Sequence, residues 1–443
     1  MSRTAFKPQI NTELPGPKAR ELIALSERHE PNCMSDQVPL VWQRGEGVVI
    51  TDVDGNQFLD FCSGVLVANV GHCHPHYVRE TQAQCAELFN CYDFVNPHRA
   101  RLAEKLVGLT APHLDKAFIL TTGAETIESA LKLARRVSEG HEIVSFEGAF
   151  HGRTFGAMSV GGIGGVKQGF GPLLTGCIQA PFCYCYRCPF DRSFPDCEHH
   201  CLDQLDEVVD RQSTGGICAL ITEPYQGAAG SIIPPEGYME KLQAWCRERE
   251  VLFILDEVQS SFGRTGTMFA YEHYGVEPDL LCLGKGLGSG VPCSAVVGRS
   301  EIMDVLSPGE MSSTNGGNPL SCRAALAAIK IVEDEDLPAN SARVGGQMME
   351  RLIQMQADHE CLGDVRGQGL VIGLEIVEDK ESKTPAPELT KRIIHEAYLR
   401  GLAMIAPIGL HGNVIRIAPP LVITAEQAQA GLDILDQAFA AAR

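Results

Sequence analysis

The sequence predicts an α/β protein with a largely parallel sheet, and two features of the chain support this prediction. Short apolar runs typical of buried strands recur along it, and stretches with the periodicity of amphipathic helices lie between them. The 443 residues can bury a large core, in two or three domains or in one large domain with an appendage. We expect the second arrangement.

The predicted elements begin with a hairpin. Residues 47–60 hold two short apolar runs around the turn Asp54-Gly55, which is typical of a β-hairpin. Six central strands should follow, and then a helix over residues 319–334 that leads into a last segment with two more strands. The central strands are expected at residues 116–120, 142–146, 217–222, 251–255, 280–283 and 295–298, and the last two at residues 371–375 and 413–417.

Composition restricts the classes of partner. The chain has 37 Lys and Arg against 56 Asp and Glu, a formal net charge of -19, and no basic run that could follow a phosphate backbone. We therefore expect no nucleic-acid partner. Residues 1–25 lack the apolar core of a signal peptide, and no later stretch resembles a membrane span, so we expect a cytoplasmic protein that binds no membrane.

The 17 cysteines are unevenly distributed, and five of them lie in residues 183–201. Cys185 and Cys188 form a CxxC pair, and Cys197 and Cys201 are four apart, which are spacings that a zinc or iron–sulfur site can use. The second pair lacks the usual knuckle pattern, and a cytoplasmic compartment keeps thiols reduced. We therefore predict a loop with free thiols at Cys183, Cys185, Cys188, Cys197 and Cys201, and no metal.

Lys285 and Asp256 are the most informative residues. Lys285 lies among glycines in Leu283-Gly284-Lys285-Gly286, and Asp256 ends an apolar run. A buried lysine has its ammonium form disfavoured and can present a free amine, and a strand-end carboxylate can lie under a pyridine nitrogen. These are the two groups that pyridoxal phosphate chemistry requires. Singly, each has an ordinary explanation as a turn lysine or a capping aspartate, so the surrounding pattern decides.

Other predicted strand ends carry suitable groups. Gly123 and Ala124 precede a predicted helix, whose exposed N–H groups and dipole suit a phosphate. After the next strand, Phe150 can stack on a pyridine ring and Arg153 can reach a substrate carboxylate, although a core phenylalanine is the commoner case. Gln259, three residues after Asp256, can hydrogen-bond a phenolic oxygen or be an exposed loop residue.

Together these residues resemble the class III pyridoxal phosphate aminotransferases, the fold-type I group that includes 4-aminobutyrate and ornithine aminotransferases. The likeness extends over almost the whole chain. The matching segments are residues 52–56, 71–75, 256–266, 283–288 and 313–320, together with Arg416.

The resemblance implies a role for each site residue. Lys285 would carry the internal aldimine and shuttle the proton, and Asp256 would pair with the ring nitrogen. Gly123 and Ala124 would bind the phosphate through their amides. Phe150 would stack on the ring, His151 would neighbour it, Gln259 would touch its oxygen, and Thr314 would reach the phosphate of a neighbouring subunit.

The resemblance also implies the architecture. It indicates a mixed seven-stranded sheet with helices on both faces, and a small α+β domain built from both chain ends. Residues 1–70 would contribute to the small domain, residues 71–330 would form the large cofactor-binding domain, and residues 331–443 would complete the small domain. The role of Thr314 implies a homodimer with shared active sites, and whether two dimers form a tetramer stays open.

Two arginines bear on the substrate. Arg416 matches the family position that clamps an α-carboxylate, and Arg153 matches the position that 4-aminobutyrate-type enzymes use for a distal carboxylate. Together they suit an ω-amino or α-amino acid donor and a 2-oxo acid acceptor such as 2-oxoglutarate. Ala228 departs from the family, which has a glutamate there that masks the clamp arginine. Val65 is a further candidate for setting donor length.

Other functions remain open at this point. A racemase or epimerase of the same family would use Lys285 and the same cofactor but return the proton to the opposite face of the α-carbon. A decarboxylase or lyase would release carbon dioxide or an eliminated group. A regulatory module that only binds the cofactor would need neither Lys285 nor Asp256 for chemistry, and their presence counts against it.

Overall fold

The computed structural model describes residues 7–34 and 36–442. The chain divides into two units. The first unit comprises the described residues of Met1–Pro75, Arg264–Gly266 and Asp336–Arg443, and the second comprises His76–Gly263 and Thr267–Glu335. As domain boundaries, residues 70 and 330 stay a prediction.

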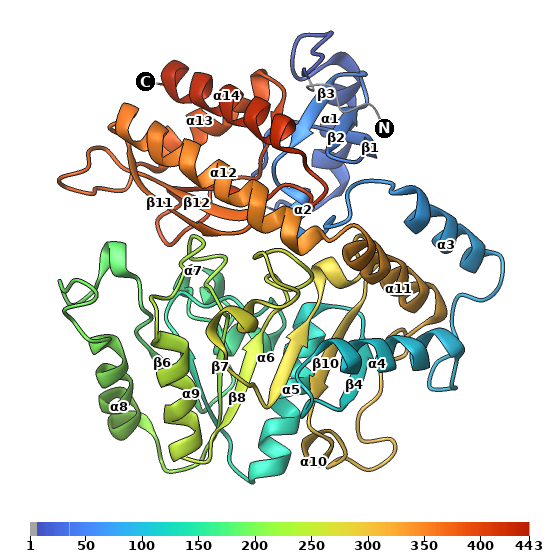
Figure 1. Ribbon diagram of the computed structural model, residues 1–443, viewed down its shortest axis with the longest axis vertical. Coiled ribbons are helices and arrows are strands. Elements are labelled where there is room, and N and C mark those ends of the chain that lie inside the picture. The colour runs from blue at the N-terminus through green and yellow to red at the C-terminus, as the bar shows by residue number, and fades with distance from the viewer. Residues whose placement is uncertain (1–6, 35, 443) are drawn as a thin grey trace. The chain divides into compact units, whose positions relative to one another are not determined.

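The second unit is built around a seven-stranded sheet with the order β4-β10-β9-β8-β7-β5-β6 (Figure 1). All the pairs from β9 through β6 are parallel, whereas β10 runs antiparallel to both β9 and β4. The mixed seven-stranded sheet implied by the resemblance is therefore confirmed. The strands are β4 (Lys116–Leu120), β5 (Glu142–Phe146), β6 (Cys177–Ala180), β7 (Ile217–Thr222), β8 (Leu252–Asp256), β9 (Leu280–Leu283) and β10 (Ser294–Gly298).

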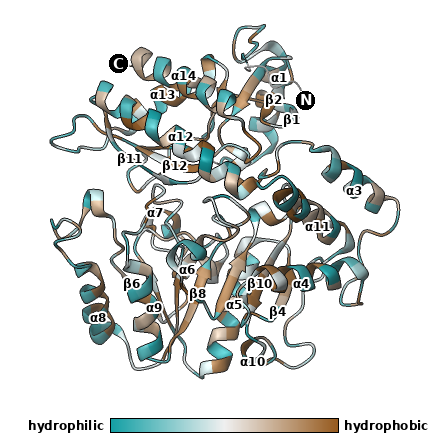
Figure 2. Ribbon diagram, in the orientation of Figure 1, coloured by the Kyte–Doolittle hydropathy of each residue, from teal (hydrophilic) through white to brown (hydrophobic). Residues whose placement is uncertain are grey.

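Helices cover both faces of this sheet. Successive side chains of a strand point to opposite faces, so each strand contributes to an apolar cluster on either side. In β8, Phe253 and Leu255 belong to one apolar cluster and Ile254 to another. The helix α5 (Gly123–Ser138) packs over the face of Ile254, while α4 (Pro97–Leu109), α9 (Tyr238–Glu248) and α11 (Pro319–Asp334) contribute to the other cluster. Figure 2 shows the apolar strands between helices whose outer faces are hydrophilic.

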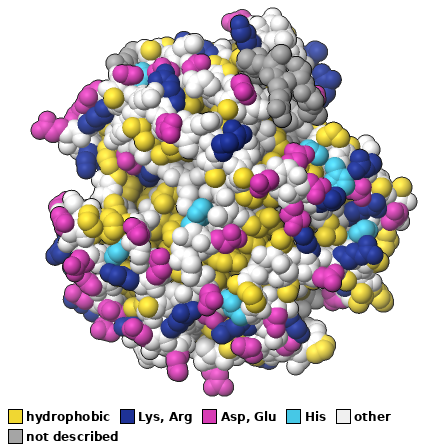
Figure 3. Space-filling view, viewed as in Figure 1, with side chains coloured by type: hydrophobic (Ala, Val, Ile, Leu, Met, Phe, Trp, Pro, Cys, Tyr) yellow, Lys and Arg dark blue, Asp and Glu magenta, His cyan; other side chains and the backbone are white. Residues whose placement is uncertain are grey.

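The remaining helices of the second unit are shorter or lie at its edges. They are α3 (Pro75–Cys85), α6 (Phe155–Val160), α7 (Gly164–Lys167), α8 (His200–Gln212), α10 (Ser300–Met303) and the 3₁₀ turns η1 (Cys185–Arg187), η2 (Ala270–Tyr274) and η3 (Lys285–Leu287). Among the described helices of the whole chain, none is long and apolar enough to cross a membrane. On the face in Figure 3, acidic and basic side chains are interspersed.

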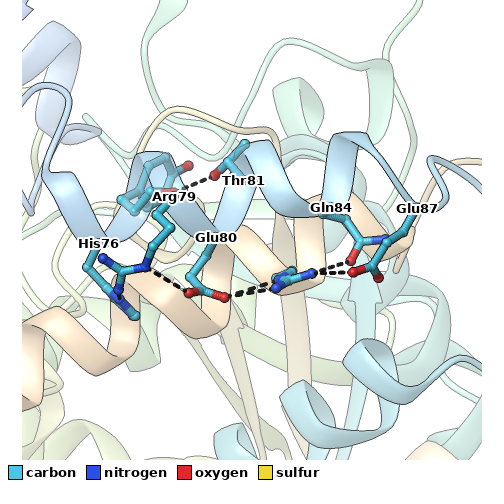
Figure 4. A network of polar contacts seen from close by, with 8 residues as sticks. His76, Arg79, Glu80, Thr81, Gln84 and Glu87 are labelled. Atoms are coloured by element: carbon cyan, nitrogen blue, oxygen red, sulfur yellow. Dashed lines mark hydrogen bonds and ion pairs between the residues drawn. The ribbon is translucent and has the colours of Figure 1, made fainter.

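A polar clamp holds α3 to α11 (Figure 4). Arg323 on α11 donates to the Glu80 carboxylate from Nε at 3.2 Å and from Nη2 at 3.1 Å, and to Glu87 Oε1 from Nη1 at 3.1 Å. Among the described residues of α3, only Gln84 is fully buried, so the helix has little apolar surface with which to dock. The hydrogen bonds of Arg323 therefore attach α3 to α11, a task that apolar packing performs for the other helices.

The first unit contains two small sheets. One has the order β1-β2-β3-β13 and the other β11-β12-β14. The predicted hairpin is present as β2 and β3, and β3 pairs in parallel with β13 from the far end of the chain, so a small α+β part built from both ends is confirmed. The strands are β1 (Trp42–Glu46), β2 (Val49–Asp52), β3 (Gln57–Asp60), β11 (Leu362–Gln368), β12 (Val371–Ile376), β13 (Leu402–Ala403) and β14 (Val414–Ile417), and the helices are α1 (Pro17–His29), α2 (Ser63–Leu66), α12 (Leu337–Asp358), α13 (Pro387–Leu399) and α14 (Ala425–Ala441).

Arg264 is the largest fully buried side chain of the first unit, with no exposed surface. Its Nη1 donates to the carbonyls of Leu370 at 2.9 Å and Pro419 at 2.6 Å. Its Nη2 donates to Asn69 Oδ1 at 2.8 Å and to Ser63 Oγ at 3.3 Å. One side chain therefore satisfies acceptors from both ends of the chain.

Replacement of Arg264 by Met should lower the free energy of unfolding by at least about 3 kcal/mol, because buried acceptors that lose a charged donor each cost about 1–3 kcal/mol. Urea unfolding followed by circular dichroism measures this change. The exposed Arg343, which bonds Asn340 on the same helix, is the control, and Arg343→Met should change stability by less than about 0.5 kcal/mol. Equal effects of the two variants would contradict the role of Arg264.

Candidate active site

A cavity of about 180 Å³ lies at the carboxyl edge of the seven-stranded sheet, within the second unit. Five strands that run in one direction end beside it, namely β4, β5, β7, β8 and β9. Open α/β sheets bind ligands at this edge, because loops after parallel strands gather there. The lining residues are Gly123, Ala124, Phe150, His151, Gly152, Glu223, Ala228, Asp256, Val258, Gln259 and Lys285.

The N-terminus of α5 forms one wall of the cavity. Thr122 caps the helix by accepting from the Glu125 N–H at 3.2 Å, and Gly123 and Ala124 follow in the first turn. The first N–H groups of a helix have no intrahelical acceptor and carry the positive end of the dipole, so this wall favours an anion. The Glu125 carboxylate accepts from the Thr121 N–H at 2.9 Å and from Ser313 Oγ at 2.7 Å, which holds the segment before Thr314 beside the turn.

Two glycines allow the backbone to close around Val258. A Cβ atom at Gly123 would lie 2.7 Å from Val258 Cγ1, and one at Gly284 would lie 3.1 Å from the same atom. Gly152 adopts a φ of 142°, which favours glycine, and a Cβ there would lie 2.8 Å from the Cβ of Ala124. The strand-end turns therefore approach one another more closely than residues with side chains permit.

Asp256 is held by two hydrogen bonds. Its Oδ2 accepts from His151 Nδ1 at 2.7 Å, and its Oδ1 accepts from the Val258 N–H at 3.0 Å. Burial lowers the pKa of His151, but the hydrogen bond and charge of Asp256 outweigh this effect, so the pKa is raised above its ordinary value. His151 Nε2 is buried and has no hydrogen-bond partner among the described residues. The pair thus places a supported carboxylate against the cavity.

Glu223 is a site residue that was not predicted from the sequence. Only 6% of it is exposed, and its carboxylate accepts from the Phe150 N–H at 3.1 Å and from the Gly227 N–H at 3.0 Å. Burial raises the pKa of Glu223 to about 7, and Asp256 acts in the same direction against the opposing effect of His151. It directly follows the strand predicted at residues 217–222, and this position was the signal that could have identified it.

Lys285 lies just after β9 and lines the same cavity. Its φ of 41° is in the left-handed region that non-glycine residues rarely adopt. Such strained backbone is concentrated at functional sites, where the surrounding structure holds it. Among the described residues that line this cavity, Lys285 is the only lysine. Its strained backbone is not expected of an ordinary surface loop.

Four predicted site residues are not among the residues that line the cavity. Arg153 is exposed, and its guanidinium lies 5.7 Å from the centre of the Phe150 ring. Thr314 is exposed in the loop before α11. Val65 and Arg416 belong to the first unit, where Val65 is 37% exposed and Arg416, in β14, is 5% exposed. The roles predicted for these four side chains stay predictions.

The cysteine-rich segment lies elsewhere in the second unit, around a cavity of about 20 Å³. All five cysteines of residues 183–201 line it as free thiols. Burial and the neighbouring thiols raise the pKa of Cys201 to about 12, so that it is protonated at neutral pH. Among the described residues, no three Cys, His, Asp or Glu side chains are grouped so that they could hold a metal ion.

The lining groups fit pyridoxal phosphate. The cofactor has an aldehyde, a pyridine nitrogen and a phosphate, and the cavity offers a lysine amine, a carboxylate and the start of a helix. Gly123 has no side chain to cover the backbone N–H groups at the helix start, as a bound phosphate requires. Fold and site together define an α/β enzyme of the pyridoxal phosphate class.

Comparison with known proteins identifies the family. The family model described as aminotransferase class-III matches residues 32–439. A 4-aminobutyrate aminotransferase of Mycobacterium leprae is 36% identical over 435 residues, which are 97% of each chain. An alanine/serine racemase of Pyrococcus horikoshii is 38% identical over 447 residues, covering 98% of this chain and 92% of that protein. The chain belongs to the class III aminotransferase family.

A solved structure supports the same assignment. The amine transaminase from an uncultivated Pseudomonas species, determined in its PLP-bound form, matches with a TM-score of 0.88 and 35% identity over 93% of this chain and 98% of that one. This protein is therefore a pyridoxal-phosphate-dependent transaminase, as the resemblance implied. Its substrates are a separate question.

The stability of the apoprotein should depend on pH through Glu223. Because the folded pKa, about 7, lies above the ordinary value of 4.5, its contribution is complete below pH 4.5 and is lost as the pH rises through 7. Glu223→Gln should therefore reduce the fall in unfolding free energy between about pH 5 and about pH 8, by on the order of 2–3 kcal/mol. Urea unfolding at both pH values measures it.

The control for this experiment is the exposed Glu248, whose replacement by Gln should leave the pH dependence unchanged. The comparison uses the difference between two pH values within each variant. A uniform loss of stability caused by the altered hydrogen bonds of the introduced amide therefore cancels. Parallel pH profiles for the wild type and Glu223→Gln would refute the raised pKa.

Proposed function

We propose that the protein transfers an amino group from an ω-amino or α-amino acid to a 2-oxo acid such as 2-oxoglutarate, with Lys285 and Asp256 as its central residues. The observation that carries this proposal is that Lys285, Asp256 and the N-terminus of α5 line one cavity. When bound, pyridoxal phosphate supplies an aldehyde that condenses with amines and a ring that accepts electrons. The protein supplies position, charge and proton transfer.

Each group of the cavity has a proposed task. The N–H groups of Gly123 and Ala124 bind the phosphate, and Phe150 packs on the ring. The Asp256 carboxylate keeps the ring nitrogen protonated, and His151 holds that carboxylate in place through the 2.7 Å hydrogen bond. Gln259, which also lines the cavity, contacts the phenolic oxygen.

Lys285 is proposed as the residue that both anchors the cofactor and moves the proton. With pyridoxal phosphate bound, the Lys285 amine would hold the aldehyde of the cofactor, and in its free form it would move the proton of the substrate carbon. Positioned acid–base catalysis of this kind contributes about 10²–10⁴-fold to a rate. The strained backbone of Lys285 supports this assignment, because it directs the side chain from a fixed turn.

The substrate proposal rests on motif positions. Arg416 is proposed to bind the α-carboxylate, Arg153 a distal carboxylate, and Val65 to limit donor length. The M. leprae relative is named for 4-aminobutyrate, which supports an ω-amino donor. Ala228 lines the cavity where the family glutamate would be expected, and its methyl group cannot pair with an arginine. The alanine at this position therefore favours donors that carry an α-carboxylate, which Arg416 would bind.

Racemisation is the second candidate, favoured by the P. horikoshii relative named for alanine and serine racemisation. A half-reaction separates the two functions. The protein loaded with pyridoxal phosphate is mixed with single amino acids and amines, without a 2-oxo acid, and its visible absorption is followed. Conversion to the aminated cofactor supports transamination and ranks the donors. Unchanged absorption with loss of optical activity of the amino acid would favour racemisation.

We also propose that the protein is a homodimer in which Thr314 completes the partner's phosphate site. The motif of residues 313–320 supports this, together with the exposed position of Thr314. A cytoplasmic location stays a prediction from the composition of the chain.

Replacement of Lys285 by Ala should abolish both the visible absorption of the cofactor-loaded protein and turnover, because no other lysine of the described chain lines the cavity. Absorption spectra after addition of pyridoxal phosphate and removal of excess cofactor measure this effect. The exposed Lys330 on α11 is the control, and Lys330→Ala should retain both signals. Persistence of the absorption and turnover in Lys285→Ala would refute the assignment.

Replacement of Arg416 by Ala should raise KM for an α-carboxylate substrate far more than for a simple amine. Hydrogen bonds to charged groups contribute about 1.5–3 kcal/mol each, so kcat/KM for the carboxylate substrate should fall at least about tenfold. Steady-state kinetics with an α-amino acid and a matching amine measure the difference. Equal losses for both substrates would show that Arg416 is not the clamp.

A further inference from the structure

We propose that Tyr225 is a positioning residue that sets the orientation of the Gln259 side-chain amide, so that the amide presents its N–H donors to the bound cofactor. This inference rests on the proposed function, in which Gln259 contacts the phenolic oxygen of pyridoxal phosphate. Tyr225 lies in the loop after β7 and is not one of the residues that line the cavity, so the inference adds a supporting residue behind the lining. Both residues belong to the second unit.

One hydrogen bond joins the two residues. The hydroxyl of Tyr225 donates to Gln259 Oε1 at 3.2 Å, and only 2% of Tyr225 is exposed. A glutamine amide has an oxygen that accepts and a nitrogen that only donates. Because the hydroxyl engages Oε1, Nε2 is the end of the amide that remains for a ligand in the cavity. The contact therefore determines which chemical group Gln259 offers.

A second contact limits the movement of the amide. A Cβ atom at Gly227 would lie 2.0 Å from Gln259 Oε1 and 2.6 Å from its Cδ, so the amide lies directly against the backbone of residue 227. With this backbone on one side and the Tyr225 hydroxyl at Oε1, the amide has little room to turn over. Any side chain at position 227 would displace it.

The loop that carries Tyr225 is itself held at several points. Glu223 accepts from the N–H groups of Phe150 and Gly227, and the hydroxyl of Tyr274 donates to the Pro224 carbonyl at 3.0 Å. These bonds flank Tyr225 on both sides in the sequence. The tyrosine hydroxyl is therefore placed before a ligand arrives, which is the condition for a preorganised donor at a functional site.

The orientation has an electrostatic consequence. A donor at the phenolic oxygen stabilises negative charge there, and this disfavours protonation of the nitrogen that joins Lys285 to the cofactor. Loss of the donor should therefore raise the midpoint pH of the visible absorption of the loaded protein. An amide turned over would direct Oε1 at the phenolic oxygen, and two acceptors would repel. Tyr225 thus influences the protonation of the nitrogen that joins Lys285 to the cofactor, although it does not touch that nitrogen.

The test compares Tyr225→Phe, Gln259→Leu and the double variant. We expect Tyr225→Phe to raise the midpoint pH by about 0.5 unit and the dissociation constant of pyridoxal phosphate by about threefold, as for loss of part of one neutral hydrogen bond. Gln259→Leu should give larger changes in the same directions. The double variant should match Gln259→Leu, because a tyrosine that acts only through Gln259 has no effect without it.

Tyr271→Phe is the matched control, since it removes the hydroxyl of another buried tyrosine, one that accepts from the Ala111 N–H at 3.1 Å and not from the loop that carries Tyr225. It should lower the melting temperature and leave the midpoint pH unchanged. Additive shifts in the double variant, or equal shifts in Tyr225→Phe and Tyr271→Phe, would overturn the inference alone. A wild-type protein without Lys285-dependent visible absorption would overturn the proposed function and this inference together.

Discussion

The parallel register of the central strands is the constraint on which the site depends. Thr222 pairs with Leu255 in the ladder of β7 and β8, and Asp256 pairs with Cys282 in that of β8 and β9. These pairings bring the chain out of the sheet at one edge, where the helix start, the carboxylate and the lysine come together. A slip of one residue in β8 would turn Asp256 to the opposite face and replace it with Leu255 or Glu257.

The same edge concentrates buried charge that apolar packing cannot offset. Glu223 and Asp256 are both nearly buried, and His151 interacts electrostatically with each of them. Two carboxylates in one low-dielectric region repel, and a protonated imidazole lessens that repulsion. The imidazole therefore supports the Asp256 carboxylate and also compensates for the charge of Glu223. Such groups are tolerated in a core where chemistry requires them.

Much of this arrangement could be predicted from the sequence, because strands that are buried on both faces appear as uniform apolar runs. The predicted bounds of β4, β5, β7 and β9 agree with the structure, and α11 begins and ends where expected. The strands β1, β6, β11 and β13 were missed, since β1 is mostly exposed, β6 buries only alternate residues, most of β11 is half-buried and β13 has only two residues. Glu223 was missed because an acidic residue after a strand is common, and its partners are two backbone N–H groups that only the fold brings near.

Arg264 has a consequence for synthesis of the chain on the ribosome. All seven strands of the large sheet have emerged once residue 335 is free, so that unit holds its complete set of elements at this stage. Arg264 then still lacks the carbonyls of Leu370 and Pro419, which are translated later. Its guanidinium must stay hydrated until roughly the last hundred residues are translated and can pack with the amino-terminal segment. The order of translation therefore separates the maturation of the two units in time.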